Sequence, residues 1–436
     1  MAGAAKLENF PTAEPQQTPS AHSKLAWPQY IWLIVLLPFI QALLSWDFDG
    51  NLSSLQYVMR HLSVPALTVE IFILFYAMGS GFSPLHAINR LETRVRALIL
   101  VWFVFAIASS LLQYNDKLAS LLTMSRFILH GCFLAAVVYC IANMRTPESS
   151  RWLNTISIGI VCYVAVLAIF ALIVSEPDKF PWATRMPSAT NIRQIANIVA
   201  ISAAAPIALL LFGNGAYQRS SAFSLAALVM FLAWSGSRTA LFAIVVSIFA
   251  AMIFVRTWPK FKAATVMMVS FVFGLVASLP LPAPSPAFGL IRMFDKMQET
   301  DNVSSGRMQF WIDTIGQILK HPWLGYGSGR FRENMHQMYG TNLNHPHNFI
   351  LQFTYDWGIF GAAAILSLLL CLMWTIWKKA PTDPLIGFAT GSGFLTLCAI
   401  AMVDGAFFYP LTIIAAIMMI APILVSTDKC RGLAKL

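Results

Sequence analysis

The sequence predicts an all-α, polytopic integral membrane protein with about 12 transmembrane helices and one long helical loop. Hydrophobic residues make up 58% of the 436 residues and charged residues only 11%, a mixture that cannot build a soluble surface. Runs of about 20 apolar residues, the length that crosses a ~30 Å hydrocarbon core, recur along the whole chain.

The predicted spans are apolar runs separated by polar or glycine- and proline-containing connections. They are 26–46, 62–83, 95–113, 118–142, 153–175, 193–213, 219–235, 238–256, 260–281, 348–376, 383–403 and 406–425. The polar residues 1–25 lack the apolar core and small-residue cleavage site of a signal peptide, so we expect the first span to be an uncleaved anchor.

The organisation that follows has five parts. They are a cytoplasmic tail at 1–25, transmembrane helices 1–9 within 26–281, a loop on the outer face at 282–347, transmembrane helices 10–12 within 348–425, and a cytoplasmic tail at 426–436. Lys and Arg are much more frequent in the short connections on the side of the N-terminus, which predicts that both termini are cytoplasmic. The net charge of +10 then reflects topology and attraction to anionic lipids, and we expect membrane lipids and no nucleic acid as partners.

Cysteine usage argues against a disulfide framework or a zinc cluster. Five of the six cysteines fall within predicted spans and the sixth, Cys430, lies in the C-terminal tail. The acidic residues of the long loop form no DxD-like metal motif. No metal and no cofactor are therefore expected.

The long loop is predicted to contain two amphipathic helices. Residues 287–298 and 305–320 each carry apolar side chains at helical spacing. Packing onto the membrane domain is the simpler interpretation of both stripes. The glycine-rich stretch 322–329 follows, where the backbone can turn tightly or approach a ligand closely.

Cationic side chains and a histidine collect at the outer boundary of the predicted bundle. Arg193 opens the sixth span, Arg238 opens the eighth and His347 precedes the tenth, while Arg307 and Arg330 lie in the loop on the same side. Such arginines often only reach toward lipid headgroups. Gathered around one opening, they would also bind a phosphate or diphosphate through paired hydrogen bonds, and a neutral histidine there would accept a proton near neutral pH.

Several other polar residues fall within or at the ends of spans. Asp404, at the outer end of the eleventh span, is a candidate for the rim of the same cavity. Asp356 lies about 13 Å deeper than His347 along a helix and is not expected to orient it. Glu70 and Arg126 lie at similar depths, and a buried structural ion pair is the simpler interpretation, with a conduit or a substrate contact as the alternative.

The spacing around His347 resembles a family signature. His347-Asn348, followed after nine residues by Gly358 and after two more by Gly361, resembles the signature of bacterial O-antigen ligases. The stretch 235–240, Ser-Gly-Ser-Arg-Thr-Ala, resembles an element of the wider superfamily of O-antigen ligases and polymerases.

Further likeness lies in the long loop. Arg307 followed by Trp311, and the stretch 321–331 (His-Pro-Trp-Leu-Gly-Tyr-Gly-Ser-Gly-Arg-Phe), resemble the rest of that superfamily's domain. The resemblance covers about residues 190–410.

The resemblance implies a metal-independent glycosyltransferase of the bacterial inner membrane, with its active site facing the periplasm. Such an enzyme moves a polysaccharide from undecaprenyl diphosphate to lipid A–core oligosaccharide. By position, His347 matches the essential histidine of the family, and Arg193, Arg238 and Arg307 match arginines that bind the diphosphate. Further candidates for substrate contacts are Asn348, Gln194, Tyr326, Arg330 and Asp404.

These residue types suit the reaction. The diphosphate is a good leaving group once arginines hold its charge, and the acceptor hydroxyl can pass its proton to neutral His347. Direct attack opposite the diphosphate would invert the anomeric centre. An O-antigen polymerase, a protein O-oligosaccharyltransferase and a lipid-linked glycan transporter remain alternatives.

Overall fold

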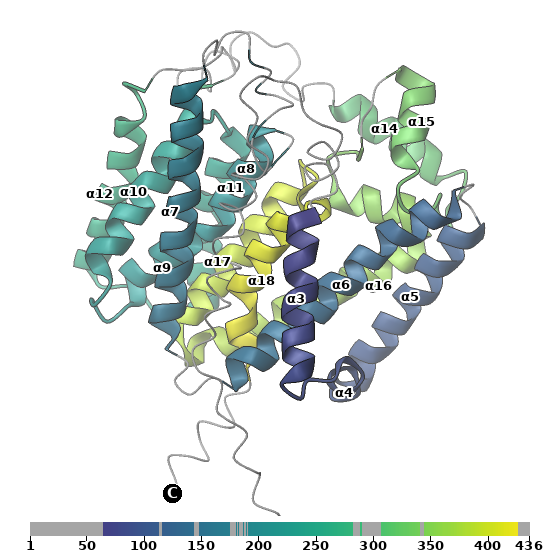
Figure 1. Ribbon diagram of the computed structural model, residues 1–436, viewed down its shortest axis with the longest axis horizontal. Coiled ribbons are helices and arrows are strands. Elements are labelled where there is room, and N and C mark those ends of the chain that lie inside the picture. The colour runs from purple at the N-terminus through teal and green to yellow at the C-terminus, as the bar shows by residue number, and fades with distance from the viewer. Residues whose placement is uncertain are drawn as a thin grey trace, which may run out of the picture.

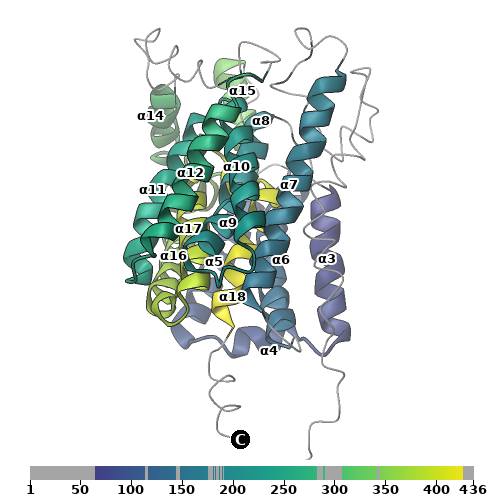
Figure 2. The same ribbon diagram turned by 90° about the vertical axis from the view of Figure 1, so that its left-hand side faces the viewer.

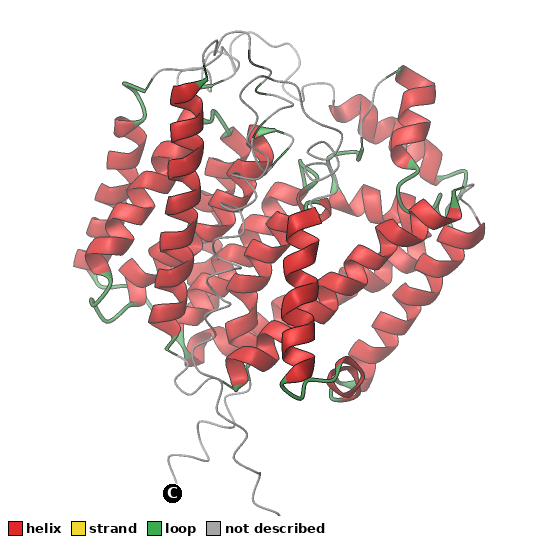
Figure 3. Cartoon of the chain, viewed as in Figure 1, coloured by secondary structure: helices red, strands yellow, loops and turns green. Residues whose placement is uncertain are grey.

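The computed structural model describes only part of the chain. The described residues are 64–112, 116–143, 148–174, 180, 182, 186, 189, 191–281, 288–289, 307–340 and 344–425. Within them all regular elements are helices, and the only extended pairing is an isolated bridge between Met186 and Ala189 (Figure 3). The predicted all-α class is confirmed for this part of the chain.

Seven helical segments among the described residues are long and apolar enough to cross a membrane. They are α5 (Thr93–Leu112), α6 (Lys117–Ala142), α7 (Ser149–Ile173), α8 with α9 (Ile192–Ser202 and Ala204–Phe212), α11 (Arg238–Val255), α16 with η1 (Phe349–Lys379 and Ala380–Thr382) and α17 (Pro384–Ala401). The other elements are α3 (Val64–Gly79), α4 (Pro84–Asn89), α10 (Gln218–Trp234), α12 (Phe261–Ala277), α14 (Arg307–Ile318), α15 (Phe331–Tyr339), η2 (Ala406–Phe408) and α18 (Pro410–Leu424).

Each predicted span from 62–83 onward coincides with a described helix or, at 193–213, with the pair α8 and α9. The span 26–46 lies outside the described residues, so the count of 12 transmembrane helices stays a prediction. The helix expected at 305–320 is present as α14, and almost all of the one expected at 287–298 lies outside the described residues. The short helices α4 and α15 were not predicted, because neither six nor nine residues suffice for a clear apolar period.

Small and hydroxylated residues allow the long helices to approach closely. A Cβ atom on Gly274 of α12 would lie 2.5 Å from the carbonyl oxygen of Ala226 on α10, so the two backbones touch there. Between α11 and α17, Ser247 forms hydrogen bonds with Ser392 and Thr396 at 3.2 and 2.7 Å. Such contacts are typical of helix packing in membranes, where the lipid supplies no hydrophobic driving force between helices.

The bundle has two distinct ends (Figures 1 and 2). Helices α14 and α15 lie together at one end, and the short α4 lies at the opposite end in both views. Figure 1 shows α14 and α15 directly beyond the region where α5, α6 and α16 come together. The predicted loop helix is therefore stacked on the end of the membrane helices.

Helix α16 is kinked at Gly358, where φ is 67° and ψ is −177°. Glycine is required there, because a Cβ atom would overlap the carbonyl group of Trp323. The kink withdraws the amides that would pair with the carbonyl oxygens of Tyr355 and Asp356 in a straight helix.

The glycine-rich loop 322–327 replaces these missing hydrogen bonds. The backbone amide of Tyr326 donates to the carbonyl oxygen of Tyr355 at 2.8 Å, and the backbone amide of Gly327 donates to the carbonyl oxygen of Asp356 at 3.0 Å. In return, the amide of Ile359 donates to the oxygen of Pro322 at 2.9 Å. The loop is thus docked into the kink, and Gly325 (φ 68°) lets the two backbones meet.

Glu70 has a different partner from the one expected. Its Oε2 atom lies 2.8 Å from Nδ1 of His130 on α6, and no ion pair with Arg126 is found. His130 follows Arg126 by one helical turn, so the interhelical polar contact is present but is made by the imidazole. Sequence spacing alone could not distinguish two polar residues on nearly the same face of α6.

Candidate active site

Two of the predicted arginines lie at helix starts. Helix α8 begins after Asn191, whose side-chain oxygen accepts the amide of Gln194 at 3.0 Å, and this cap puts Arg193 in the first turn. Helix α11 begins at Arg238 after a turn with positive φ at Gly236. Both arginines are exposed, so their guanidinium groups are available to a ligand.

Asn348 has a structural task. Its side-chain oxygen accepts hydrogen bonds from the amides of Ile350 and Leu351, both at 3.1 Å, and it is the N-cap of α16. The side chain is buried. The cap accounts for the side-chain oxygen of Asn348 and fixes where the chain leaves His347, while a substrate contact at this residue stays a prediction.

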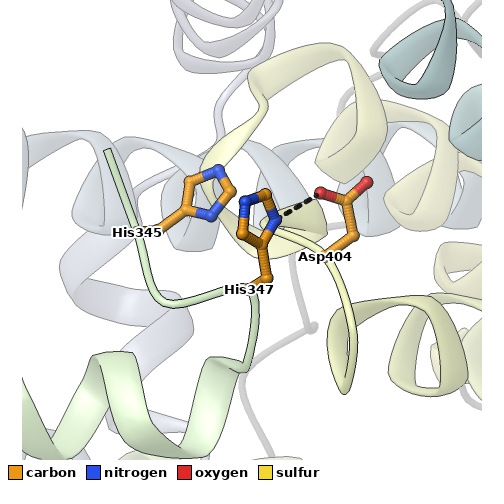
Figure 4. A group of neighbouring side chains, drawn as sticks. All are labelled: His345, His347 and Asp404. Carbon is orange, nitrogen blue, oxygen red and sulfur yellow. Dashed lines mark hydrogen bonds and ion pairs between the residues drawn. The ribbon is translucent and has the colours of Figure 1, made fainter. Parts of the chain in front are cut away.

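His347 adopts a left-handed backbone conformation, with φ at 56°. This region is uncommon for residues other than glycine and is strained. Its Nδ1 atom lies 3.3 Å from Oδ1 of Asp404, at the long end of the range for a hydrogen bond (Figure 4). An Nδ1–H donated to the carboxylate leaves the lone pair of Nε2 free to accept a proton.

Asp404 lies beyond the end of α17 and accepts three hydrogen bonds. Besides His347, the amide of Gly405 donates to Oδ1 at 2.7 Å and Nδ2 of Asn197 donates to Oδ2 at 2.8 Å. Burial by itself would raise the pKa of Asp404. The hydrogen bond from His347, the two nearby imidazoles and the hydrogen bond from Asn197 outweigh burial and hold the pKa well below its usual range.

A second chain of hydrogen bonds runs beside the first. Nε2 of His345 lies 2.7 Å from the hydroxyl of Tyr409, which in turn bonds to the side chain of Gln194. The His345 and His347 rings are edge to face, with centroids 4.5 Å apart. Burial, then repulsion by His347, lower the pKa of His345 to about 4, although Asp404 opposes the shift. His345 is therefore a neutral, buried support for the loop.

Arg307 on α14 adds a third arginine to this cluster. It is the first residue of α14, and it is electrostatically coupled to Asp404, Arg193 and Arg238. Burial and the two other arginines lower the pKa of Arg307, and Asp404 partly offsets this. The ordinary pKa of a guanidinium lies so far above neutral that the group is effectively always charged in proteins, so three cations and one carboxylate share this region.

Tyr326 and Arg330, two further candidates, belong to a different cluster. The Tyr326 ring stacks on that of Tyr355 with centroids 4.7 Å apart, and Arg330 lies over the Tyr326 ring at 5.7 Å. The hydroxyl of Tyr326 donates to Oε1 of Gln317 on α14 at 2.8 Å. These contacts hold the docked loop to α14 and α16.

His345, His347 and Asp404 also form a grouping of metal-binding type. Their ligand atoms all lie within 4.8 Å of one another. In a tetrahedral site with ligands at ~2.1 Å, neighbouring ligand atoms are about 3.4 Å apart. The His347–Asp404 separation of 3.3 Å is close to this value, so spacing does not separate the two kinds of site. Both oxygens of Asp404 already accept hydrogen bonds from the protein, which favours a hydrogen-bonded His–Asp pair.

Asn197 and Tyr409 were missed in the sequence. Asn197 follows Arg193 by four residues and so shares a face of α8 with it, which is the only local signal for its role. Tyr409 had no such signal, because its partner His345 is 64 residues away in the chain.

Comparison with protein families now bears on this geometry. Residues 223–366 match the family model described as O-antigen ligase, whereas no curated protein matches the chain. The matched segment runs from α10 into α16, past its kink, and includes Arg238, Arg307 and His347. Arg193 and Asp404 lie outside it and reach the cluster through α8 and the end of α17. The segment that carries His347 is thus similar to the O-antigen ligase family.

Proposed function

We propose that this protein is an O-antigen ligase of the bacterial inner membrane. It would transfer a complete polysaccharide from undecaprenyl diphosphate to lipid A–core in the periplasmic leaflet, with inversion and without a metal. The observation that carries the proposal is the His347–Asp404 pair set beside three arginines from separate helices. The family match over the segment that contains His347 supports the same reaction class.

His347 is assigned the role of general base. Asp404 accepts a hydrogen bond from Nδ1–H of His347, and this bond holds the imidazole in the tautomer with a free Nε2 lone pair. Nε2 takes the proton of the acceptor hydroxyl as that oxygen forms a bond to the anomeric carbon. The bond between the anomeric carbon and the diphosphate oxygen breaks, and its electron pair leaves with undecaprenyl diphosphate.

The arginines are assigned to the leaving group. Arg193 and Arg238 are exposed at helix starts, and Arg307 faces them from α14. Planar guanidinium groups bind phosphate oxygens in pairs and stabilise the charge that develops as the bond breaks. The three cations repel one another, and a bound anion would relieve this repulsion and so bind more tightly.

Reconstitution tests the proposal directly. Purified protein would be mixed with lipid-linked O-antigen and rough lipopolysaccharide, and capped lipopolysaccharide is the expected product. Longer lipid-linked chains would instead indicate a polymerase. With a pilin-type protein added as a further acceptor, its glycosylation would indicate a protein O-oligosaccharyltransferase. In sealed vesicles, movement of the carrier without covalent transfer would indicate a transporter. Activity that survives EDTA is expected, and strict dependence on added metal would contradict the mechanism.

The general base has its own test. His347→Ala should abolish transfer while donor binding is retained. His336→Ala is the matched control, because His336 is exposed on α15. Normal turnover of the His347 variant would refute the assigned role.

A further inference from the structure

The indole of Trp311 on α14 reaches the loop that carries the two histidines. Its Nε1–H donates a hydrogen bond to the carbonyl oxygen of Pro346 at 2.8 Å. Pro346 lies directly between His345 and His347 in the chain. This is a side-chain contact from a separate helix to the peptide group that precedes the proposed base.

That peptide group controls the backbone of His347. Its plane turns through ψ of Pro346 and φ of His347 together, so the direction of the Pro346 carbonyl is coupled to the φ of 56° at His347. A rotation of this plane would let His347 relax to a negative φ, which residues with a Cβ atom prefer. A donor that holds the carbonyl oxygen therefore opposes the relaxation.

Trp311 also lies one turn beyond Arg307. Residues four apart share a helix face, so α14 presents Arg307 to the other arginines and Trp311 to the histidine loop from the same side. Thr314 is fully buried three residues after Trp311, whereas Ile312 and Ile315 are about half exposed, which shows that this face of α14 is the one docked.

We propose that Trp311 is a positioning residue for the transfer reaction. By holding the Pro346 carbonyl it keeps His347 in the left-handed conformation that directs Nδ1 to Asp404. One helix then sets both the base and part of the diphosphate clamp. The proposal rests on the proposed function for its kinetic consequence, but its structural consequence can be measured without any substrate.

The test uses Trp311→Phe, which keeps an aromatic ring and removes only the N–H donor. Loss of one such hydrogen bond should lower the transfer rate at saturating substrates about tenfold, while the KM for the donor changes less than twofold. Trp323→Phe is the matched control, since the Trp323 ring is exposed and stacks on Phe360 away from the histidines.

A second readout follows His347 itself. The rate of carbethoxylation by diethyl pyrocarbonate, located by mass spectrometry at His347, should rise severalfold in Trp311→Phe and stay unchanged in Trp323→Phe. The transfer rate and the His347 reactivity would both be expressed per folded molecule, and melting temperatures would show that each variant is folded at the assay temperature. Unchanged His347 reactivity, or a normal rate per folded molecule, would overturn the proposal. If wild-type protein transferred no glycan, the proposed function would fail while the His347 reactivity still tested the role of Trp311.

Discussion

Asn197 on α8 donates from Nδ2 to Oδ2 of Asp404 at 2.8 Å, although the two residues are 207 positions apart in the chain. The other carboxylate oxygen is left for His347 and the amide of Gly405. Asp404 therefore connects α8, which carries Arg193 in its first turn, to the loop that carries the proposed base. In the proposed mechanism, donor binding and proton transfer would both depend on this carboxylate.

Asp404→Asn should slow transfer about a hundredfold or more while leaving the fold intact. The amide keeps the shape but can donate to Nδ1 of His347 and select the wrong tautomer. Initial rates and donor affinity would be measured together, with Asp313→Asn on the half-exposed face of α14 as control. A rate within threefold of wild type would show that Asp404 does not orient His347.

Arg238→Lys should remain impaired although it keeps the positive charge. A point ammonium cannot reproduce the paired hydrogen bonds of a guanidinium, so transfer at limiting donor should fall at least about tenfold. The control is Arg219→Lys, because Arg219 is also exposed but lies at the start of α10. Equal effects of the two substitutions would reduce Arg238 to a general surface charge.

Gly405→Ala should displace His345 and so disturb the candidate site. A Cβ atom at this position would overlap the imidazole of His345. The ring would have to move and give up its bond to Tyr409, at a cost of about 1–3 kcal/mol. Gly316→Ala is the control, since no atom lies within 4 Å of its Cβ position. The melting temperature in detergent and the transfer rate would be measured for both variants. We expect both quantities to fall only for Gly405→Ala.

Gly358→Ala should undock the loop 322–327 from α16. The substitution would combine an unfavourable φ with an overlap at the Trp323 carbonyl, and should lower the free energy of unfolding by more than ~2 kcal/mol. Gly131→Ala in α6 meets open space and should be neutral or stabilising. Limited proteolysis within the loop would be enhanced only in the first variant, and equal cleavage of both variants would contradict the docking role.

The lowered pKa of His345 leads to a prediction of how stability depends on pH. Its pKa in the folded protein is lowered to about 4. An unfolded chain has a histidine pKa near ~6.5, so unfolding takes up a proton below that pH. Stability should fall as the pH drops from about 6.5 toward 4, by at most ~3 kcal/mol from this residue. The contribution from Asp404 is lost only at lower pH, because its folded pKa is depressed.

Melting temperatures between pH 7 and pH 4.5 check this expectation. His345→Gln removes the titrating group and should flatten the profile relative to wild type. His336→Gln, at an exposed position on α15, should leave it unchanged. Superimposable profiles for wild type and His345→Gln would show that His345 is already protonated in the folded protein, or that burial does not shift it.

Local patterns predicted the helices well and their polar partners poorly. The apolar runs after residue 62 all became helices, because length and hydropathy are properties of a short stretch of chain. The N-cap role of Asn348 was not predicted, and a substrate contact at this residue stays a prediction. Glu70 was predicted to pair with Arg126 and pairs with His130. Which side chain makes a polar contact depends on how each helix is rotated about its own axis. Hydropathy does not specify that rotation closely enough.

By itself the sequence determined the helical class of the described residues, the starts of α8, α11 and α16, and the placement of Arg193, Arg238 and His347 at those starts. Only the tertiary structure decided that Asp404 is the partner of His347, that Asn197 and Tyr409 support the two histidines, and that Trp311 reaches the Pro346 carbonyl. The physical reason is distance along the chain. Helix starts follow from caps and apolar runs within a few residues, whereas these contacts join residues 35 to 207 positions apart and exist only once the helices have packed.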